Sequence, residues 1–465
     1  MRPFLAGLLL AALAGTPARA PQAAPEPRYV VEPCCDLCPR AANPAVYNTK
    51  FLESFTTLSQ GRDGWLFRSD DLRTTFGPDA DGYRELKRFA AALKRRGVDL
   101  VAVYQPTRGM LHRDKLPKAL QKTYSVDLAK FSYSLTLQRF RNAGMVAPDM
   151  TRLLSDNKEE FFFRGDHHWT PYGSRRTAQV VADAIKALPS YKGLKRSTFT
   201  TERTGILMKK GTMYKAAMLI CGPGYAEQYV DRFATSGADS ADLFGESAVP
   251  PITLAGTSNS DSAYNFAGFL SESLGVDVLN ASIAGGRHDG ALLQYLPSEE
   301  FQKTPPKILI WEFETNHNLS QRMFYRQVVP MVSNGCLSRR AILNNRVELR
   351  GQRSEVLFNG GGRVLPLASK NHLIDLQLSD PTVREIEAVV WYTNGSKETV
   401  DLKYSPYVDG RGRFVFELRN DAEWADRTFM SLDLHQPVSM KKSVTINAQL
   451  CARADAPRQQ QASRK

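Results

Sequence analysis

The sequence predicts an α/β domain followed by an antiparallel β-sandwich. In the first two thirds of the chain, near-continuous apolar segments of strand length alternate with helices of about three turns, a pattern typical of a parallel sheet covered on both faces. After Cys336 the helical spacing disappears and short alternating segments take over. A chain of 465 residues with 42% hydrophobic composition is long enough for two such domains.

The predicted α/β domain occupies residues 25–335, and organised structure is expected from about Phe51. A helix over Tyr83 to Gly97 has apolar residues at helical spacing, a basic last turn and a glycine stop. Pro171 fits the first position of another helix. The remaining predicted elements are strands at Val98 to Gln105, Pro251 to Ala255, Val276 to Ile283 and Lys307 to Phe313, and a helix at Tyr264 to Leu274.

Ligands of open parallel sheets bind at the carboxyl ends of the strands. Four segments that follow predicted strands are expected to meet at that edge: Gln105 to Arg108, Gly256 to Ser258, Ala284 to Arg287 and Glu312 to His317. A fifth segment, Gly-Asp-His-His-Trp-Thr-Pro from Gly165 to Pro171, instead precedes a predicted helix. These segments hold the candidate catalytic residues.

The predicted β-sandwich occupies residues 336–452. Turn signals such as Asn394-Gly395 and Asp409-Gly410 separate its short strands. The polar residues 453–465 are expected to form a disordered tail. The predicted strands are Val347 to Leu349, Glu355 to Phe358, Ile374 to Leu378, Ala388 to Tyr392, Thr399 to Leu402, Phe414 to Leu418 and Val444 to Ala448.

The first residues are expected to form a secretory signal rather than part of either domain. Arg2 gives a positive start, the run from Phe4 to Ala14 is apolar, and small residues follow at Ala18 and Ala20. We assign residues 1–24 to the signal peptide, with an approximate cut site. The apolar run is too short to span a bilayer, and no later segment reaches about 18 uncharged apolar residues, so the mature chain is expected to carry no transmembrane segment.

Export makes disulfides the favoured state of the six cysteines. A bond between Cys336 and Cys451 would bracket the C-terminal region as one unit. One cysteine of the N-terminal cluster would then join Cys221. The Cys-x-x-Cys spacing within this cluster also fits a redox or zinc half-site, but no second Cys/His pair accompanies it. The clustered cysteines are Cys34, Cys35 and Cys38.

The chain is strongly basic. Its formal net charge is +13, and loss of Arg2 and Arg19 with the signal leaves +11. In an exported protein, this balance favours an anionic polysaccharide, membrane headgroups or an acidic partner rather than nucleic acid. A basic surface that serves only solubility fits the charge equally well.

Ser258 is the candidate nucleophile. It follows an apolar strand and precedes a helix, so backbone N–H groups at the turn could hold an oxyanion. Ser260 occupies the last position of what would be a Gly-x-Ser-x-Gly motif, so the α/β-hydrolase elbow is not matched. A purely structural turn serine is the competing interpretation.

Asp166 and His168 are the candidate orienting carboxylate and base. Residues two apart in an extended segment point to the same side, so Asp166 is expected to bond one ring nitrogen of His168 and leave the other for a hydroxyl. His167 is expected to point the opposite way, which argues against a metal ion held by both histidines. A capping or structural role stays open, and we expect neither a metal nor a cofactor.

The strings from Gly165 to Gly173 and from Gly256 to Ser260, together with Trp-Glu-Phe-Glu from Trp311 to Glu314, resemble the AlgX family of alginate acetyltransferases. The resemblance covers the whole chain, including the signal sequence and the cysteine spacing. It implies a circularly permuted, three-layer SGNH-hydrolase-like α/β domain followed by a carbohydrate-binding β-sandwich. It also implies that Ser258 is the nucleophile, with His168 as base.

The same resemblance places Asp166 as the orienter of the base and assigns active-site positions to Tyr264 and Arg287. Arg287 suits a uronate carboxylate or the oxyanion, although a surface arginine on a turn is the alternative. His317 stands where the family is expected to carry a tyrosine.

In the sandwich, Trp391 and Lys397 are the candidate sugar platform and its basic rim, which Arg411 and Arg413 could extend. An aromatic residue on a β-strand is otherwise more often part of a core. With the resemblance, sugar binding and a place in the core are equally favoured interpretations of this position.

The sequence thus leads to a periplasmic O-acetyltransferase that passes acetyl groups through an acetyl-serine to mannuronate hydroxyls of polymannuronate, the precursor of alginate. Its expected partners are this polysaccharide and periplasmic and inner-membrane acetylation and secretion proteins, not nucleic acid. Two alternatives remain open: a secreted SGNH-type carbohydrate esterase that uses water as acceptor, and a non-catalytic polyuronate-binding scaffold.

Overall fold

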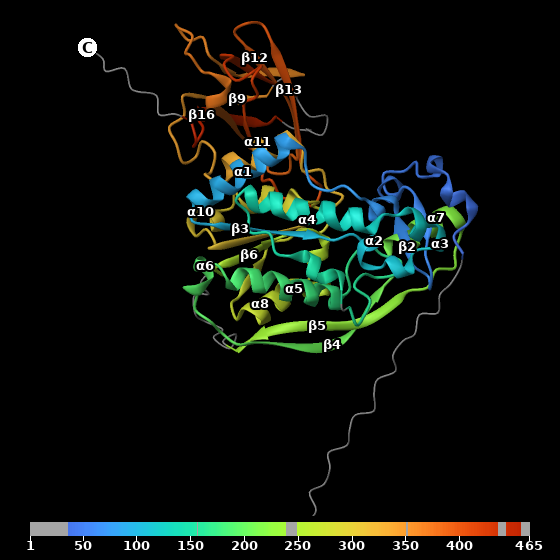
Figure 1. The fold of residues 1–465 in the computed structure, drawn as a ribbon. Coiled ribbons are helices and arrows are strands. Elements are labelled where there is room, and N and C mark those ends of the chain that lie inside the picture. Colours follow the sequence, from blue (N-terminus) through green and yellow to red (C-terminus); the bar gives the residue numbers. More distant parts are fainter. Residues whose placement is uncertain (1–35, 156, 239–248, 350–351, 436–442, 457–465) are drawn as a thin grey trace, which may run out of the picture.

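The computed structural model describes residues 36–155, 157–238, 249–349, 352–435 and 443–456 (Figure 1). The expected signal peptide, Cys34, Cys35 and the chain from residue 457 lie outside the described residues. Within the described ranges, no helix combines the length and apolarity that a bilayer crossing requires. These residues form a helix-covered parallel sheet and a C-terminal β domain, as the sequence predicts.

The core of the first domain is a four-stranded parallel sheet in the order β3-β8-β6-β7. In register, Leu100 and Thr253 both lie opposite Leu309 of the central strand. Both faces are buried, which explains the near-continuous apolar runs. The last strand is only three residues long, shorter than predicted, because Asn280 turns the chain by accepting the N–H of Ser282. The strands are β3 (Asp99–Gln105), β6 (Ile252–Ala255), β7 (Val278–Asn280) and β8 (Ile308–Glu314).

Helices cover both faces of this sheet (Figure 1). One layer contains α1, α4 and α11, and the other contains α5 and α8, which gives the expected three-layer arrangement. In α1 the buried Leu86, Phe89 and Leu93 recur at helical spacing, and Gly97 at φ 75° follows its end. The helices are α1 (Ala80–Arg95), α4 (Val126–Asn142), α5 (Pro171–Lys186), α8 (Phe266–Leu274) and α11 (Arg322–Met331).

Two additional units contribute to the site; the sequence did not indicate the first, and of the second it predicted only that a clustered cysteine bonds Cys221. A β4–β5 ribbon runs beneath α5 and α8 (Figure 1). The N-terminal segment and α7 share a small second core and are joined by the Cys38–Cys221 disulfide. The elements are β1 (Leu58–Gln60), β2 (Leu66–Arg68), β4 (Phe199–Lys209), β5 (Gln228–Gly237) and α7 (Thr212–Cys221), with short helices α2 (Arg108–Leu111), α3 (Lys118–Thr123), α6 (Pro189–Lys192), α9 (Gly290–Tyr295) and α10 (Glu299–Lys303).

The C-terminal domain consists of two antiparallel four-stranded sheets, in the orders β14-β11-β16-β9 and β10-β15-β12-β13. The Cys336–Cys451 disulfide joins its beginning to its last strand, as proposed from the sequence. Seven strands match predicted segments, while β15 is an eighth that the prediction omitted. The strands are β9 (Leu343–Glu348), β10 (Arg353–Phe358), β11 (His372–Leu378), β12 (Glu385–Tyr392), β13 (Lys397–Lys403), β14 (Arg413–Glu417), β15 (Phe429–His435) and β16 (Thr445–Ala452).

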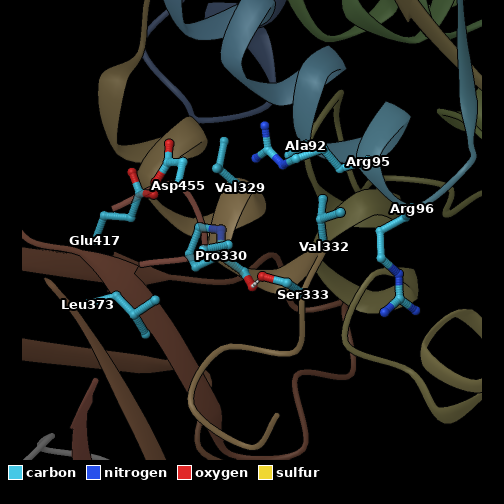
Figure 2. Close-up of a pocket in the computed structure, with 11 residues that line it drawn as sticks. Ala92, Arg95, Arg96, Val329, Pro330, Val332, Ser333, Leu373, Glu417 and Asp455 are labelled. Carbon is cyan, nitrogen blue, oxygen red and sulfur yellow. Dashed lines mark hydrogen bonds between the residues drawn. The ribbon is translucent and has the colours of Figure 1, made fainter. Parts of the chain in front are cut away.

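An ion pair joins the β domain to the helical layer: Arg88 of α1 reaches Glu417 of β14 at 2.8 Å. Within the β domain, Arg453 reaches the same carboxylate at 3.2 Å. The prediction that the disordered tail starts at residue 453 is therefore wrong, because Arg453 is buried against Glu417 and also pairs with Asp455. A hollow of about 230 Å³ lies at this junction. Figure 2 shows residues that line it, among them Arg95, Glu417 and Asp455.

Candidate active site

A buried arginine sets the path of the loop that carries Asp166 and His168. Arg108, at the start of α2, is 1% exposed and donates hydrogen bonds of 2.7 to 3.0 Å to the carbonyl oxygens of Leu66, Phe163, Arg164 and Asp166. A guanidinium offers five donors in a rigid fork, so a single side chain can hold several turns of backbone together. Arg108 belongs to a segment that the sequence placed at the site, but its role there is structural.

The N-terminus of α7 holds the same loop from another side. The N–H of Thr212 donates to Asp166 Oδ2 at 2.6 Å, and the N–H groups of Met213 and Tyr214 donate to the carbonyl oxygen of Gly165. A Cβ atom at position 165 would lie 2.3 Å from the Tyr214 ring, so glycine permits this close approach. The positive end of the helix also favours an ionised Asp166.

Asp166, His168 and Ser258 form one continuous hydrogen-bonded chain. His168 Nδ1 is bonded to Asp166 Oδ1, and His168 Nε2 lies 2.8 Å from Ser258 Oγ. Asp166 is fully buried, whereas Ser258 is partly exposed at the first position of a short 3-10 helix, Ser258–Ser260. The three residues selected from the sequence therefore meet in the order carboxylate, imidazole, hydroxyl that a nucleophilic serine requires.

The charge state of Asp166 suits an orienting role. Burial alone would raise its pKa, but His168, with smaller contributions from His167 and Lys209, holds the pKa well below its usual range. Asp166 also accepts the backbone N–H of His168 at 2.9 Å. The ionised carboxylate can therefore fix the imidazole ring and stabilise its protonated form.

His167 does not face away from His168, contrary to the prediction. Phe162 pairs with Trp169, and the residues between them form a tight turn instead of an extended strand. The two histidine rings consequently lie 3.9 Å apart between centroids, and His167 Nδ1 bonds Thr212 Oγ1 at 2.8 Å. Burial lowers the pKa of His167 to about 3, so this ring is neutral.

The clustering of Asp166, His167 and His168 also brings possible metal ligands together. One donor atom from each lies within 4.8 Å of the others. Both His168 nitrogens and His167 Nδ1 are already engaged in hydrogen bonds, however. This geometry favours a proton-transfer chain, and the absence of a metal stays a prediction.

A buried glutamate holds the turn that carries Ser258. Glu312 Oε2 accepts hydrogen bonds from Thr257 N–H at 2.8 Å, Thr257 Oγ1 at 2.9 Å and Ser260 Oγ at 3.0 Å. Gln105 donates to the other carboxyl oxygen. Burial raises the pKa of Glu312 to about 7. The N–H of Thr257 is thus used internally, and that of Ser258 is the candidate oxyanion donor.

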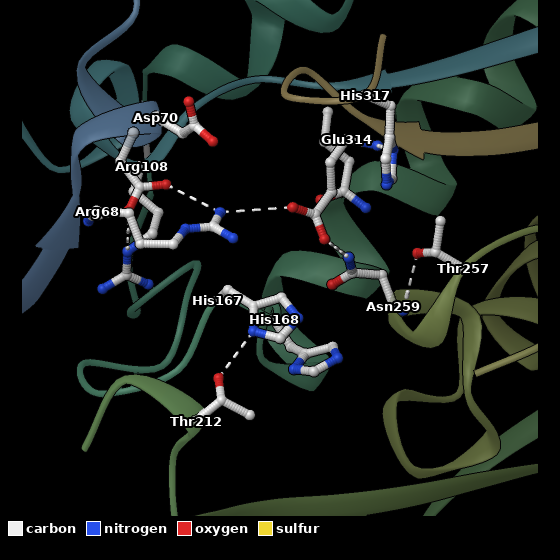
Figure 3. Close-up of polar contacts among 12 residues, drawn as sticks. Arg68, Asp70, Arg108, His167, His168, Thr212, Thr257, Asn259, Glu314 and His317 are labelled. Atoms are coloured by element: carbon white, nitrogen blue, oxygen red, sulfur yellow. Dashed lines mark hydrogen bonds and ion pairs between the residues drawn. The ribbon is translucent and has the colours of Figure 1, made fainter. Parts of the chain in front are cut away.

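A second carboxylate, Glu314, faces the site from the end of β8 (Figure 3). It contacts Arg68 at 3.4 Å and accepts from Asn259 Nδ2 at 3.2 Å. Burial raises its pKa, but Arg68 and His167 outweigh this effect and lower the pKa to about 2. The ionised Glu314 therefore anchors Asn259, the neighbour of Ser258.

Lys209 and Tyr264 complete the surroundings of the base. The Tyr264 ring is stacked on His168 at a centroid distance of 5.3 Å. Lys209, at the end of β4, donates to the Tyr264 hydroxyl and lies 3.7 Å from Asp166 Oδ1. The resemblance had indicated Tyr264, whereas Lys209 ends a polar alternating strand and gave no sequence signal.

Arg287 and His317 lie at the same edge of the sheet. Arg287 is exposed at φ 59°, and it helps lower the pKa of His317, for which burial is the main cause. His317 Nδ1 accepts the N–H of Glu314 at 3.2 Å, so in the neutral ring Nε2 carries the hydrogen. Neither side chain is hydrogen-bonded to Ser258 or His168 within the described ranges, and their substrate-binding roles stay predictions.

In the β domain, the predicted platform residues are brought together. Trp391 pairs directly with Lys397 across β12 and β13, and the Lys397 ammonium lies 5.4 Å from the ring. Trp391 Nε1 donates to Asp433 at 2.6 Å. Arg413 does not extend a basic rim, because it is buried against Asp375 at 2.8 Å, whereas Arg411 is exposed.

Comparison with known families agrees with this architecture. Residues 58–315 match the family described as SGNH hydrolase-like domain, acetyltransferase AlgX, and residues 335–463 match a C-terminal carbohydrate-binding module. These ranges correspond to the two domains of the structure.

Individual relatives cover nearly the whole chain. The alginate biosynthesis protein AlgX of Pseudomonas aeruginosa is 47% identical over 458 residues, which is 97% of this chain and 95% of the relative. AlgX of Azotobacter vinelandii is 42% identical over 92% of this chain and 90% of the relative. A solved structure of the Pseudomonas aeruginosa protein superimposes with a TM-score of 0.85 over 90% of this chain and all of that one. The chain therefore belongs to the AlgX acetyltransferase family, with an SGNH hydrolase-like domain and a C-terminal carbohydrate-binding module.

Proposed function

We propose that this protein is a periplasmic O-acetyltransferase that moves acetyl groups through an acetyl-serine on Ser258 to mannuronate hydroxyls of polymannuronate. The observation that carries the proposal is the continuous chain from Asp166 through His168 to Ser258 Oγ. A partly exposed serine with a base at 2.8 Å is arranged for nucleophilic acyl transfer.

The first half-reaction forms the acetyl-enzyme. His168 Nε2 takes the proton of Ser258 as the oxygen attacks the acetyl carbonyl, and Asp166 stabilises the resulting imidazolium. The Ser258 N–H can donate to the oxyanion of the tetrahedral intermediate. As this intermediate collapses, the bond to the donor's leaving group breaks, and His168 returns the proton to that group.

The second half-reaction uses the same base. A mannuronate hydroxyl gives its proton to His168 and attacks the acetyl carbonyl, and the Ser258 oxygen leaves and regains a proton. The transferase assignment rests on the family, because the triad itself would serve water equally well. The basic chain and the carbohydrate-binding module favour a polyanionic sugar acceptor.

The proposed location is the periplasm. The two disulfides of the described residues, Cys38–Cys221 and Cys336–Cys451, favour an oxidising compartment. The expected partners are the polysaccharide and the proteins of alginate acetylation and secretion, since relatives carry the name alginate biosynthesis protein.

Mass spectrometry of the intact protein tests the proposal. After exposure to an activated aryl acetate, the wild type is expected to gain the mass of one acetyl group on Ser258, and mannuronate oligomers are expected to discharge it. Ser258→Ala should form no adduct. Ser262→Ala, which changes an exposed serine of the same segment, is the matched control and should be acetylated like the wild type.

Two outcomes would contradict the proposal. An acetyl adduct of unchanged yield in Ser258→Ala would show that Ser258 is not the nucleophile. Discharge by water at a rate that the oligomers do not increase would instead favour the esterase.

A further inference from the structure

A loop of the β domain lies directly on the loop that carries Arg287. Ser405 Oγ donates to the carbonyl oxygen of Gly285 at 2.9 Å, and the N–H of Asp409 donates to Gln294 Oε1 at 2.7 Å. These contacts join the segment between β13 and β14 to the carboxyl edge of the parallel sheet. The carbohydrate-binding module therefore contributes surface beside the candidate active site.

Tyr407 lies between these two anchors and presents an exposed aromatic ring. The residue is 67% exposed, whereas the neighbouring Tyr404 is buried. One edge of the Tyr407 ring lies against Gly285, where an added Cβ would come within 2.5 Å of two ring carbons. Gly285, at φ 75°, thus allows the ring to rest on the backbone two residues before Arg287.

Arg287 supplies a positive charge in the same loop as Gly285. It is exposed, and in the same loop the N–H of Ile283 donates to the carbonyl oxygen of Gly256, two residues before Ser258, at 3.1 Å. The loop that carries Arg287 therefore adjoins the turn that carries the nucleophile.

We propose that Tyr407 and Arg287, from different domains, form a subsite that binds one uronate residue of the acceptor polysaccharide beside Ser258. The inference rests on the proposed function for the identity of the acceptor. The C–H face of a sugar packs on an aromatic ring, and a guanidinium pairs with a carboxylate in a bidentate manner. A uronate carries both groups on one ring, so the two side chains together select it over a neutral sugar.

Binding of mannuronate oligomers to the intact protein, measured by calorimetry without an acetyl donor, tests this subsite. Tyr407→Ala is expected to weaken binding about 10-fold, while Tyr407→Phe, which keeps the ring, should stay within about 2-fold of the wild type. Arg287→Gln should weaken binding about 10-fold and reduce its dependence on salt. The double variant should lose less than the product of the two single losses, because both groups hold one sugar.

The matched control is Ser405→Ala, which removes the hydrogen bond to Gly285 and the acceptor of the Tyr407 N–H but keeps the ring. Its affinity should equal that of the wild type. An equal loss in Ser405→Ala and Tyr407→Ala would mean that only domain docking matters, and unchanged affinity in Tyr407→Ala would remove the subsite. If the losses of the two single variants multiply in the double variant, Tyr407 and Arg287 do not bind the same sugar. Each of these three results would overturn the inference.

Failure of the inference is distinguishable from failure of the proposed function. Acetylation of wild-type Ser258 by an aryl acetate reports on the nucleophile without any sugar. If Ser258 is acetylated and Tyr407→Ala binds normally, only the subsite is wrong. If Ser258 stays unmodified while Tyr407→Ala loses affinity, only the acyl-transfer mechanism is wrong.

Discussion

Replacement of Glu312 by glutamine should make the protein more stable at alkaline pH. The buried Glu312 carboxyl has a pKa of about 7, against an ordinary value of 4.5, because burial disfavours its charged form. The folded protein therefore binds this proton more tightly than the unfolded chain does. The stabilisation is fully present below about pH 4.5 and is lost as the pH rises through about 7.

The magnitude follows from the size of this shift. At 1.36 kcal/mol per pKa unit, the rise from 4.5 to about 7 lowers the unfolding free energy of the wild type by about 3 kcal/mol between about pH 4.5 and about pH 8. Glutamine resembles the protonated acid. Its oxygen can accept the hydrogen bonds of Thr257 and Ser260, and the Gln105 amide can rotate to accept from its NH₂ group. The variant should lack this loss.

The assay is urea unfolding at several pH values. Unfolding is monitored by hydrogen exchange in peptides of β6 and β8, so that the α/β domain is observed directly. Glu314→Gln is the control of opposite sign, since the pKa of Glu314 is lowered to about 2, chiefly by Arg68 against the effect of burial. Glu314 contributes stability above about pH 4.5 that is lost as the pH falls through about 2, so this variant should lose up to about 3 kcal/mol at neutral pH. Parallel pH profiles of the wild type and Glu312→Gln would refute the reasoning.

Two further predictions concern the supports of Asp166. Lys209→Met should slow formation of the acetyl-enzyme by about 10 to 100-fold, because Tyr264 and Asp166 lose their shared partner, while Lys209→Arg should restore most of the rate. Stopped-flow kinetics with an aryl acetate measures both rates. Equal rates in Lys209→Met and the wild type would contradict this role of Lys209. Joint replacement of Cys38 and Cys221 by serine should lower the unfolding free energy by about 2 to 5 kcal/mol. It should also increase hydrogen exchange in α7, and unchanged exchange there would show that the disulfide does not support the site.

The fold could be predicted to the level of domains because its signals are local. The apolar runs at β3, β6 and β8 are buried on both faces, so their composition alone distinguishes them from the alternating strands after Cys336. β7 was predicted too long, because the turn at Asn280 depends on a side chain bonding the backbone two residues on. The β4–β5 ribbon was missed because its exposed polar strands carry no burial signal.

In the candidate site, too, the residues marked by local motifs were predicted and those brought in from distant segments were not. Asp166, His168 and Ser258 could be predicted to meet, because their residue types and the family motifs around them indicate a carboxylate, a base and a nucleophile. It misplaced His167, because period-two alternation was applied to a segment that forms a tight turn. Lys209 and the N-terminus of α7 reach Asp166 from segments more than 40 residues away, and no local pattern encodes such contacts.

Contacts from outside the parallel sheet support the carboxylate that orients His168. Burial alone would raise the pKa of Asp166, but its interactions with His168, His167 and Lys209 outweigh burial and lower it, and Lys209 comes from the ribbon. The α7 N–H that caps Asp166 belongs to a helix tied to the N-terminal segment by Cys38–Cys221. Formation of the disulfide in an oxidising compartment therefore stabilises the unit that completes the hydrogen bonding of Asp166. The disulfide and the N–H that caps Asp166 therefore belong to one unit, whereas the serine turn is held by Glu312 of the sheet.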